Sequence, residues 1–490
     1  MKLYLKGHNY RYATEQMLLT LFPGERPEYP TQRMARGENS LVLTLSRAKS
    51  WATAHALLTY EGQTYSHFSK APDPPEHTGR LERDRVLQRI LKTAFYRAGT
   101  EALGREPPWG ALTGVRPVKI PTKALTQGFT PRQADGMLRD LYRVSEERRR
   151  LALDCARATL AIRDTLEERE VSLYVGIPFC PSRCAYCSFI SADGKALALL
   201  DPYLDALVRE VHAVGSVLAR AGRRVRSVYF GGGTPTTLSP EQLHRLLGEL
   251  EEHIDLTWCS EYTVEAGRPD TITAEKLSVL KAHGCARVSV NPQTMSDAVL
   301  RAIGRGHTAG DFLAAWDLVR QAGFSVVNMD LIAGLPADNE GGFRASLDQI
   351  LSLEPENLTV HTLALKKGSR LMEQGGGLPS AEEVSHMLDY AWNALREAGY
   401  APYYLYRQKY MSGGFENVGW SVPGAESLYN ICMMEELHTI VSLGAGGVTK
   451  LIDPRAGSLT RLSNPKYPKE YISHIDQIIM QKEEIPWPIN

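Results

Sequence analysis

The sequence has 490 residues, and its 56 Lys and Arg are balanced by 56 Asp and Glu, so the formal net charge is zero. That balance excludes a protein that binds nucleic acid through bulk positive charge. Hydrophobic residues make up 43% of the chain, which predicts a packed core. No stretch approaches the roughly 18 uninterrupted apolar residues of a membrane span, and the first residues lack the apolar core of a signal peptide. We therefore expect a cytoplasmic protein with no membrane span and no nucleic-acid partner.

The first part of the chain, residues 1–168, shows the pattern of an α+β domain. An amphipathic helix is expected at 81–104, and another is expected to begin after the capping residue Ser145. The run Arg148 to Arg150 is interpreted as a solvated face of that helix. Further short segments are expected as strands at 2–5, 40–45 and 56–60 and as a helix at 14–21. No motif in this domain indicates its role.

From Val171 onward, short β-branched runs alternate with longer helical segments, the pattern of parallel strands joined by crossover helices. The expected strands are 173–177, 227–230, 262–265, 287–290, 326–332 and 358–362. Helices are expected to begin at the capping residues Ser239 and Thr273. Six such units are too few to close an eight-stranded barrel, which usually needs about 250 residues. The predicted fold class is therefore α/β, with residues 169–365 forming either a partial (β/α)6 barrel or an open sheet.

The last part of the chain, residues 366–490, is less regular. Only a helix at 381–398 is clear from its periodicity. We expect the rest of this region to form an irregular extension that packs on the barrel.

Three of the seven cysteines lie together after the first strand of the barrel region, in the sequence Cys180-Pro-Ser-Arg-Cys184-Ala-Tyr-Cys187. Three thiolates in one short loop can face one metal centre, and thiolates favour zinc, copper(I) or an iron–sulfur cluster. A structural zinc would need a fourth Cys or His nearby, and Ser188 and Phe189 follow instead. Three thiolates on a four-iron cluster leave one iron open to another ligand.

Glycines and carboxylates occur at or near the ends of other strands in this region, where a barrel places its functional groups. Gly231 to Gly233 follow the second strand and allow close backbone approach to a ligand, although a plain turn explains them equally well. Glu265 ends the third strand, and Asp330 lies inside the fifth. A buried carboxylate needs a partner, so Asp330 either binds a ligand or makes a structural hydrogen bond.

The cysteine spacing, with an aromatic residue before the last cysteine, resembles the cluster loop of the radical S-adenosylmethionine (radical SAM) enzymes. The resemblance implies a 4Fe-4S cluster held by Cys180, Cys184 and Cys187, with S-adenosylmethionine bound to the open iron as the source of a radical. The segments Gly231 to Pro235 and Met329 to Pro336 are similar to blocks of the oxygen-independent coproporphyrinogen III dehydrogenase subfamily. By that resemblance the S-adenosylmethionine site is lined by Tyr174, Gly232, Gly233, Thr234, Glu265, Gln293, Arg305, Asp330 and Ala364.

Differences from the subfamily pattern indicate the branch that the chain resembles. The dehydrogenase proper has a further cysteine two residues after the third ligand, where this chain has Phe189, and the related heme chaperones share that lack. Those chaperones carry a His-Asn-x-x-Tyr-Trp heme motif, whereas the aligned segment here, Tyr429 to Met434, lacks the histidine and the aromatic pair. Cys432 or Met433 could still ligate a heme iron. The segment Leu112 to Pro117 most resembles the HemZ branch of the coproporphyrinogen dehydrogenase-like proteins.

The resemblance implies a radical SAM oxidoreductase of heme biosynthesis, which decarboxylates two propionates of coproporphyrinogen III oxidatively to give protoporphyrinogen IX without oxygen. Such an enzyme needs an external electron donor of the flavodoxin or ferredoxin type and an electron acceptor of unknown identity. The alternatives are a heme-binding chaperone-like protein and a radical SAM enzyme that acts on another tetrapyrrole. Basic residues either pair with the propionates of this tetrapyrrole substrate or are plain surface charges, and the candidates are Arg183, Lys366, Lys367, Arg407 and Lys409.

Overall fold

The structure is a computed structural model that describes residues 1–30, 38–75, 78–187, 192–365, 369–371, 377–408, 412–453, 458–485 and 487. The chain divides into two compact units. The first contains Met1–Ala156 and Tyr406–Glu416, and the second contains Arg157–Leu405 and Asn417–Asn490. The chain therefore returns once to the first unit, and the extension expected at 366–490 is divided between the two units.

The first unit is built on a four-stranded sheet in the order β1-β2-β3-β4, with β1 parallel to β2 and the other neighbours antiparallel. Alternate residues of β2 and β3, such as Leu43 and Ala54, are buried in one core with the helix α2 (Arg80–Leu103), which confirms the helix expected at 81–104. The strand β4 was not expected, because its polar sequence buries little. The strands are β1 (Lys2–Lys6), β2 (Ser40–Arg47), β3 (Trp51–Tyr60) and β4 (Gln63–Pro72).

Shorter helices complete the first unit, and a buried ion pair holds the returning segment. The interpretation of a solvated face is wrong for Arg148, whose side chain is 5% exposed. Its Nε donates to Oε1 of Glu416 at 2.9 Å, and Nε1 of Trp109 donates to Oε2 of the same carboxylate at 2.6 Å. Arg150 is exposed as expected. The helices are α1 (Arg11–Leu21), α3 (Lys119–Thr126), α4 (Pro131–Tyr142) and α5 (Glu146–Arg163), whose last residues belong to the second unit.

The second unit is built on an eleven-stranded sheet in the order β11-β12-β10-β9-β8-β7-β6-β5-β13-β14-β15. Strands β5 to β10 are neighbours in chain order and pair in parallel, which confirms the expected α/β class. All six expected strands are present, and each observed strand includes its predicted range. In the described part of the chain the sheet is open, because β11 and β15 are its two ends. The parallel strands are β5 (Glu170–Ile177), β6 (Arg224–Gly232), β7 (Glu261–Gly267), β8 (Arg287–Val290), β9 (Val326–Ala333) and β10 (Asn357–Thr362).

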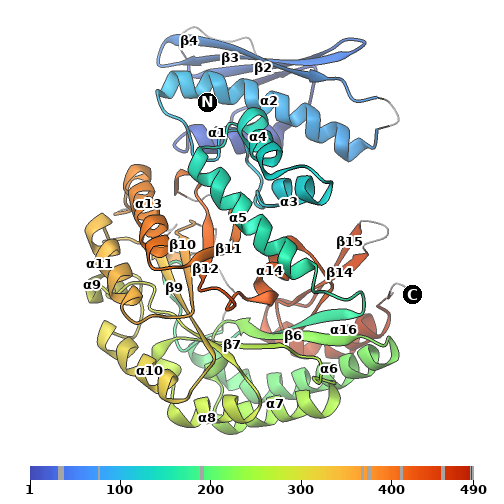
Figure 1. The fold of residues 1–490 in the computed structure, drawn as a ribbon, viewed down its shortest axis with the longest axis vertical. Helices are drawn as coiled ribbons and strands as arrows, with labels where there is room; N and C mark the ends of the chain where they lie inside the picture. The colour runs from blue at the N-terminus through green and yellow to red at the C-terminus, as the bar shows by residue number, and fades with distance from the viewer. Residues whose placement is uncertain are drawn as a thin grey trace. The chain divides into compact units, whose positions relative to one another are not determined.

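Crossover helices follow the parallel strands and cover the outer side of the sheet (Figure 1). Two of them begin where the sequence predicts. Ser239 and Gln242 form a capping box at the start of α7, and Thr273 caps α8. The helices are α6 (Leu200–Arg220), α7 (Pro240–His253), α8 (Ala274–Ala282), α9 (Asp297–Ala302), α10 (Ala309–Gln321) and α11 (Glu340–Leu351).

The two faces of the parallel sheet differ in chemistry. In β5, the apolar Leu173 and Val175 are fully buried, and they alternate with Ser172 and Tyr174, which point to the opposite face. The register places Ser172 beside Ser227 of β6, with their hydroxyls 2.6 Å apart, and places Tyr174 beside Tyr229. One face of the sheet therefore carries polar and aromatic side chains instead of a plain aliphatic core.

The C-terminal region is more regular than expected, because its strands extend both ends of the sheet. These strands are short, so their sequences lack a clear hydrophobic period. In β12, Gly419 also interrupts the pattern, and glycine is needed there because a Cβ would lie 1.8 Å from the Tyr404 ring. The strands are β11 (Ala401–Tyr406), β12 (Asn417–Ser421), β13 (Ile440–Leu443), β14 (Val448–Asp453) and β15 (Ser458–Ser463). The helices are α13 (Ala381–Glu397), which confirms the expected one, α14 (Leu428–Glu435), α15 (Pro468–Ser473) and α16 (Ile475–Glu483). Among the described residues, no helix has both the length and the apolar character that crossing a bilayer requires.

Candidate active site

The cysteine loop begins where β5 ends. Cys180 and Cys184 are each 9% exposed, and Cys187 is half-buried. The backbone N–H of Cys187 donates to the carbonyl of Cys184 at 3.1 Å, which closes a tight turn between these two cysteines. Sγ of Cys180 lies 3.4 Å from Oγ1 of Thr234, so the first cysteine touches the loop that follows β6. The structure thus places three thiols in one partly enclosed loop, as the spacing predicts.

Two arginines support this loop. Nη1 of Arg268 donates to the carbonyl and the hydroxyl of Ser182 at 3.0 and 2.9 Å, while its Nη2 pairs with Asp270 at 2.7 Å. Nη2 of Arg305 donates to the hydroxyl of Tyr186, the aromatic residue before the last cysteine, at 3.2 Å. Arg268 was not identified from the sequence, because its partner Ser182 lies far away in the chain.

Buried nitrogen atoms beside the loop have no partner in the described part of the chain. They are Nε and Nη1 of Arg305 and both ring nitrogens of His307. Burial lowers the pKa of His307 to about 4, so its imidazole is neutral near pH 7. Buried polar atoms normally have hydrogen-bond partners, so these nitrogens are donors and acceptors suited to a polar ligand.

The glycine loop, which we define as residues 231–235 at and just beyond the end of β6, packs directly against the end of β5. The backbone N–H of Gly233 donates to the carbonyl of Ile177 at 2.8 Å, and that of Thr234 donates to the carbonyl of Phe179 at 2.7 Å. A Cβ on Gly233 would lie 2.4 Å from the carbonyl oxygen of Phe179, and Gly232 has a φ of +110°. Glycine is therefore required here by the backbone itself, close to Cys180.

Glu265, at the end of β7, is a buried carboxyl whose ionised form is destabilised. Burial, together with the nearby charge of Asp330, raises the pKa of Glu265 to about 7. The hydroxyl of Tyr229 donates to Oε1 of Glu265 at 2.5 Å and opposes that rise. Near neutral pH this carboxyl can therefore either accept or donate a hydrogen bond.

Asp330 of β9 remains ionised in spite of its burial. Burial alone would raise its pKa, but His361 on β10 and the hydrogen bonds of neighbouring side chains hold the pKa of Asp330 below its ordinary value. Oδ1 accepts from Nδ2 of Asn328 at 2.8 Å, and Oδ2 lies 3.7 Å from Nε2 of His361. Asp330 thus has structural partners and also contributes to the charge felt by Glu265.

Three stacked tyrosines lie on the polar face of the sheet. The rings of Tyr229 and Tyr429 are 4.3 Å apart between centroids, and Tyr174 lies 6.4 Å from each of them. Tyr429 is delivered by α14, whose first backbone N–H groups, at Leu428 and Tyr429, donate to the Glu261 carboxylate at 2.7 and 3.0 Å. Tyr229 was missed from the sequence, and Tyr429 was noted only as a replaced histidine, because the strand register and the packing of α14 bring them together.

The remaining predicted ligand residues lie at the ends of their strands. Gln293 follows β8 with a φ of +67°, and its backbone exchanges hydrogen bonds with Asp330 and Ile332 of β9 at 2.9 and 3.0 Å. Ala364 lies just beyond β10 and is half-buried. Gln293 and Ala364 therefore lie at the carboxyl ends of β8 and β10.

The predicted substrate residues have different surroundings. Arg183 lies half-buried within the cysteine loop. Arg407 belongs to the first unit and is 7% exposed, and its guanidinium donates to the backbone carbonyls of Leu112 and Gly414. Burial lowers the pKa of Arg407 to about 10. The other candidates lie outside the described residues: Lys366, Lys367 and Lys409.

Known proteins resemble this chain in sequence and in fold. Residues 174–350 match the model of the radical SAM superfamily. The chain is 42% identical over 381 residues to the oxygen-independent coproporphyrinogen-III oxidase-like protein HemZ of Bacillus subtilis (strain 168), and the match covers 76% of each protein. It is 31% identical over 283 residues to the heme chaperone HemW of Lactococcus lactis, covering 56% of this chain and 69% of that protein. These matches confirm the resemblance seen in the cysteine loop and in the strand-end segments.

A solved structure is similar over most of the same region. Coproporphyrinogen III oxidase (HemN) from Escherichia coli, described as a radical SAM enzyme, matches with a TM-score of 0.53 and 26% identity, covering 66% of this chain and 73% of that chain. The match confirms the expected partial-barrel fold.

Proposed function

Because the chain belongs to the radical SAM superfamily, in the family of the HemZ coproporphyrinogen-III oxidase-like proteins, we propose that it converts coproporphyrinogen III to protoporphyrinogen IX without oxygen. The reaction would be the oxidative decarboxylation of two propionate side chains to vinyl groups. The observation that carries the proposal is the loop of three thiols at the end of β5, beside buried unpartnered nitrogens of Arg305 and His307.

The residues at the end of β5 fit a 4Fe-4S cluster and S-adenosylmethionine. Cys180, Cys184 and Cys187 would hold the cluster, because thiolates are its usual ligands. The unpartnered nitrogens of Arg305 would pair with a carboxylate such as that of the methionyl group. When bound, the cluster and S-adenosylmethionine supply one-electron chemistry that can remove a hydrogen atom from an unreactive carbon.

The chain's own residues would orient S-adenosylmethionine along the carboxyl edge of the sheet. Glu265 can accept from a ribose hydroxyl when ionised and donate when protonated, and Tyr229 holds its position. The glycine loop brings backbone N–H and C=O groups close to Cys180. The proposed contacts are Tyr174, Gly232, Gly233, Thr234, Glu265, Gln293, Arg305, Asp330 and Ala364.

The tetrapyrrole would be held through its propionates. Arg183 is the candidate that the cysteine loop itself carries, whereas the guanidinium of Arg407 already donates to backbone carbonyls. Lys366, Lys367 and Lys409 complete the proposed basic set. Electrons would enter from a flavodoxin or ferredoxin type of donor in the cytoplasm and leave to an external acceptor.

A heme-binding, chaperone-like role is the second candidate, because the HemW relative is a heme chaperone. In the segment aligned with the heme motif, two candidate positions are buried, and Met433 is half-buried with its Sδ accepting from Nζ of Lys450 at 3.0 Å. Tyr429 is 3% exposed in the tyrosine stack, and Cys432 is fully buried, with burial raising the pKa of its thiol. These observations favour an enzyme over a carrier that uses this segment.

Anaerobic reconstitution tests the proposal at two levels. Reconstituted protein should contain a four-iron cluster whose EPR signal shifts when S-adenosylmethionine is added, and the Cys184→Ala variant should lose that signal. Incubation with coproporphyrinogen III, a reductant and an electron acceptor should then give a product that has lost two carboxyl groups by mass spectrometry. Cleavage of S-adenosylmethionine without any change in the tetrapyrrole would overturn the substrate and leave the radical chemistry. A heme titration that shifts the Soret band would favour the second candidate.

A further inference from the structure

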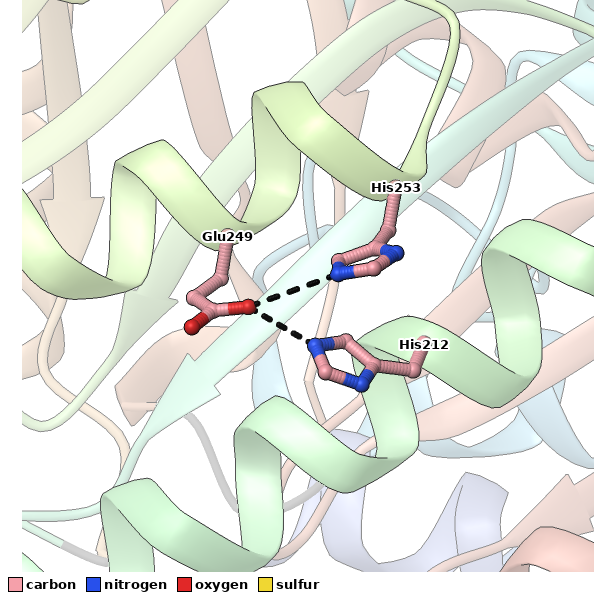
Figure 2. A group of neighbouring side chains, drawn as sticks. All are labelled: His212, Glu249 and His253. Carbon is pink, nitrogen blue, oxygen red and sulfur yellow. Dashed lines mark hydrogen bonds and ion pairs between the residues drawn. The ribbon is translucent and has the colours of Figure 1, made fainter.

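Helices α6 and α7 carry a cluster of two histidines and one glutamate on the outer side of the sheet, away from the cysteine loop. Glu249 and His253 are four residues apart on α7, which places them on one face of that helix. His212 of α6 points toward the same space (Figure 2). Oε2 of Glu249 lies 2.7 Å from Nε2 of His212 and 3.5 Å from Nε2 of His253.

We propose that His212, Glu249 and His253 form a binding site for a divalent transition-metal ion, with zinc as the preferred occupant. Imidazole nitrogens and a carboxylate oxygen are zinc ligands, at about 2.0–2.2 Å from the ion. Donors around a tetrahedral zinc are therefore about 3.3 Å from one another. The three donor atoms here all lie within 4.8 Å of one another, and two of the separations bracket that value. Small side-chain rotations would bring the three onto one ion, with a fourth position left for water.

The backbone holds this arrangement in place. A Cβ on Gly215 of α6 would lie 2.1 Å from the carbonyl oxygen of His253, so only glycine allows the two helices to approach this closely. His212 precedes Gly215 by about one turn and is therefore held opposite Glu249. The imidazole rings of His212 and His253 are 3.7 Å apart between centroids.

The site is also reachable from water. The side chains of His212, His253 and Glu249 are 44%, 33% and 29% exposed. An aqueous ion can therefore enter without any movement of the helices.

A neighbouring cluster offers a matched comparison. Nδ1 of His244 on α7 lies 2.8 Å from Nε2 of His283, and Nδ1 of His283 lies 2.9 Å from Oε2 of Glu251. His283 thus uses its two ring nitrogens for two different partners, and the three groups form a chain instead of converging on one point. This cluster should not bind zinc tightly, although its composition is the same.

Zinc binding by the reconstituted holoenzyme tests the proposal. The protein, with its iron–sulfur cluster in place, is dialysed anaerobically against buffered micromolar free zinc, and zinc and iron are measured together. Wild-type protein should bind one more zinc ion per chain than His212→Gln or His253→Gln does. The affinity of this site for zinc should be at least about tenfold lower in either variant. The His244→Gln control should bind as much zinc as wild type. Iron content and circular dichroism should be the same in all four proteins, which excludes misfolding and loss of the cluster.

Zinc K-edge absorption gives a second readout that iron does not disturb. The expected spectrum has nitrogen and oxygen neighbours at about 2.0–2.1 Å and no sulfur. Sulfur neighbours at about 2.3 Å would place the zinc on cysteines and overturn the proposal. Equal zinc binding by wild type and both histidine variants would overturn it as well.

Discussion

Glu265 illustrates how one residue couples the site to pH. Its ordinary pKa is 4.5, and burial raises the pKa to about 7 in the folded protein. Between these two values the folded protein keeps a proton that the unfolded chain releases. Stability should therefore fall as pH rises from about 4.5 to about 7, and should then level off.

The Glu265→Gln variant should lose this dependence, because the amide does not ionise. In protein without S-adenosylmethionine, the variant should gain stability relative to wild type across that pH window, by at most about 3 kcal/mol. Thermal melting at a series of pH values measures the difference. Tyr229→Phe should extend the fall in stability to higher pH, since the Tyr229 hydroxyl lowers the Glu265 pKa. Parallel curves for wild type and Glu265→Gln would show that burial does not raise the pKa of Glu265 in the folded protein.

At the residue scale, the sequence predicts the part of the site that lies in contiguous motifs. The cysteine loop and the glycines after β6 have local spacing, and Glu265 and Asp330 end or interrupt apolar strands. Tyr229, His361 and Arg268 have no such signal, because their roles arise from the register between strands and from contacts across the sheet. The burial of Arg148 could not be predicted for the same reason, because its partner Glu416 lies 268 residues away in the sequence.

At the scale of elements, the contact between the glycine loop and the end of β5 leaves no room for an added methyl group at Gly233. Gly233→Ala would place Cβ 2.4 Å from the Phe179 carbonyl, so the backbone before Cys180 must move. Such crowding costs about 1–3 kcal/mol. We expect a folded protein with a reduced iron content after reconstitution and with S-adenosylmethionine binding weakened by about tenfold or more.

Gly248→Ala is the control for this substitution. Gly248 lies within α7, and the nearest atom to its Cβ would be 3.9 Å away. Alanine should stabilise that helix by about 0.5–1 kcal/mol and leave the iron content unchanged. Equal iron contents for Gly233→Ala and Gly248→Ala would mean that the packing of the two loops does not control the cluster.

The buried pair of Arg148 and Glu416 holds the segment 406–416 in the first unit. Arg148→Met would remove the guanidinium that pairs with the Glu416 carboxylate, which is 4% exposed, at a cost of about 3–5 kcal/mol. Thermal melting should record this loss, and limited proteolysis should cut first within 406–416. Adding Glu416→Leu should restore most of the stability, because the buried carboxylate is then removed together with its arginine. A double variant as unstable as the single one would show that the carboxylate has other essential partners.

The elements that the sequence predicts are the long or strongly periodic ones. The six parallel strands and the helices α2, α7, α8 and α13 have clear apolar periods or N-capping side chains. Strands β4 and β11 to β15 are short, partly polar or interrupted by glycine, and tertiary pairing at the sheet edges determines them. The sequence pattern does not distinguish a partial barrel from an open sheet. The comparison with a solved structure makes that distinction.

At the scale of the whole molecule, the residues proposed to hold the cluster all lie in the second unit. The first unit is a separate stretch of sequence, except that the segment 406–416 returns to it. The three cluster cysteines, Glu265 and Asp330 all belong to the second unit, and the chain leaves that unit only at 406–416 between β11 and β12. That excursion makes hydrogen bonds with Arg148, Trp109 and Leu112, and it loses these bonds once residues 1–156 are removed.

This arrangement predicts how fragments should behave. A fragment of residues 157–490 should still assemble an iron–sulfur cluster, since the cysteine loop, Arg268 and Arg305 are intact, but its segment 406–416 should be cut rapidly by protease. A second fragment, in which a short Gly-Ser linker replaces 407–416, should keep the same iron content and resist cleavage there, because β11 and β12 remain neighbours in the sheet. Iron analysis and timed proteolysis measure both properties. If neither fragment binds iron, the first unit is required to build the cluster site. The prediction that the second unit alone holds the cluster would then be wrong.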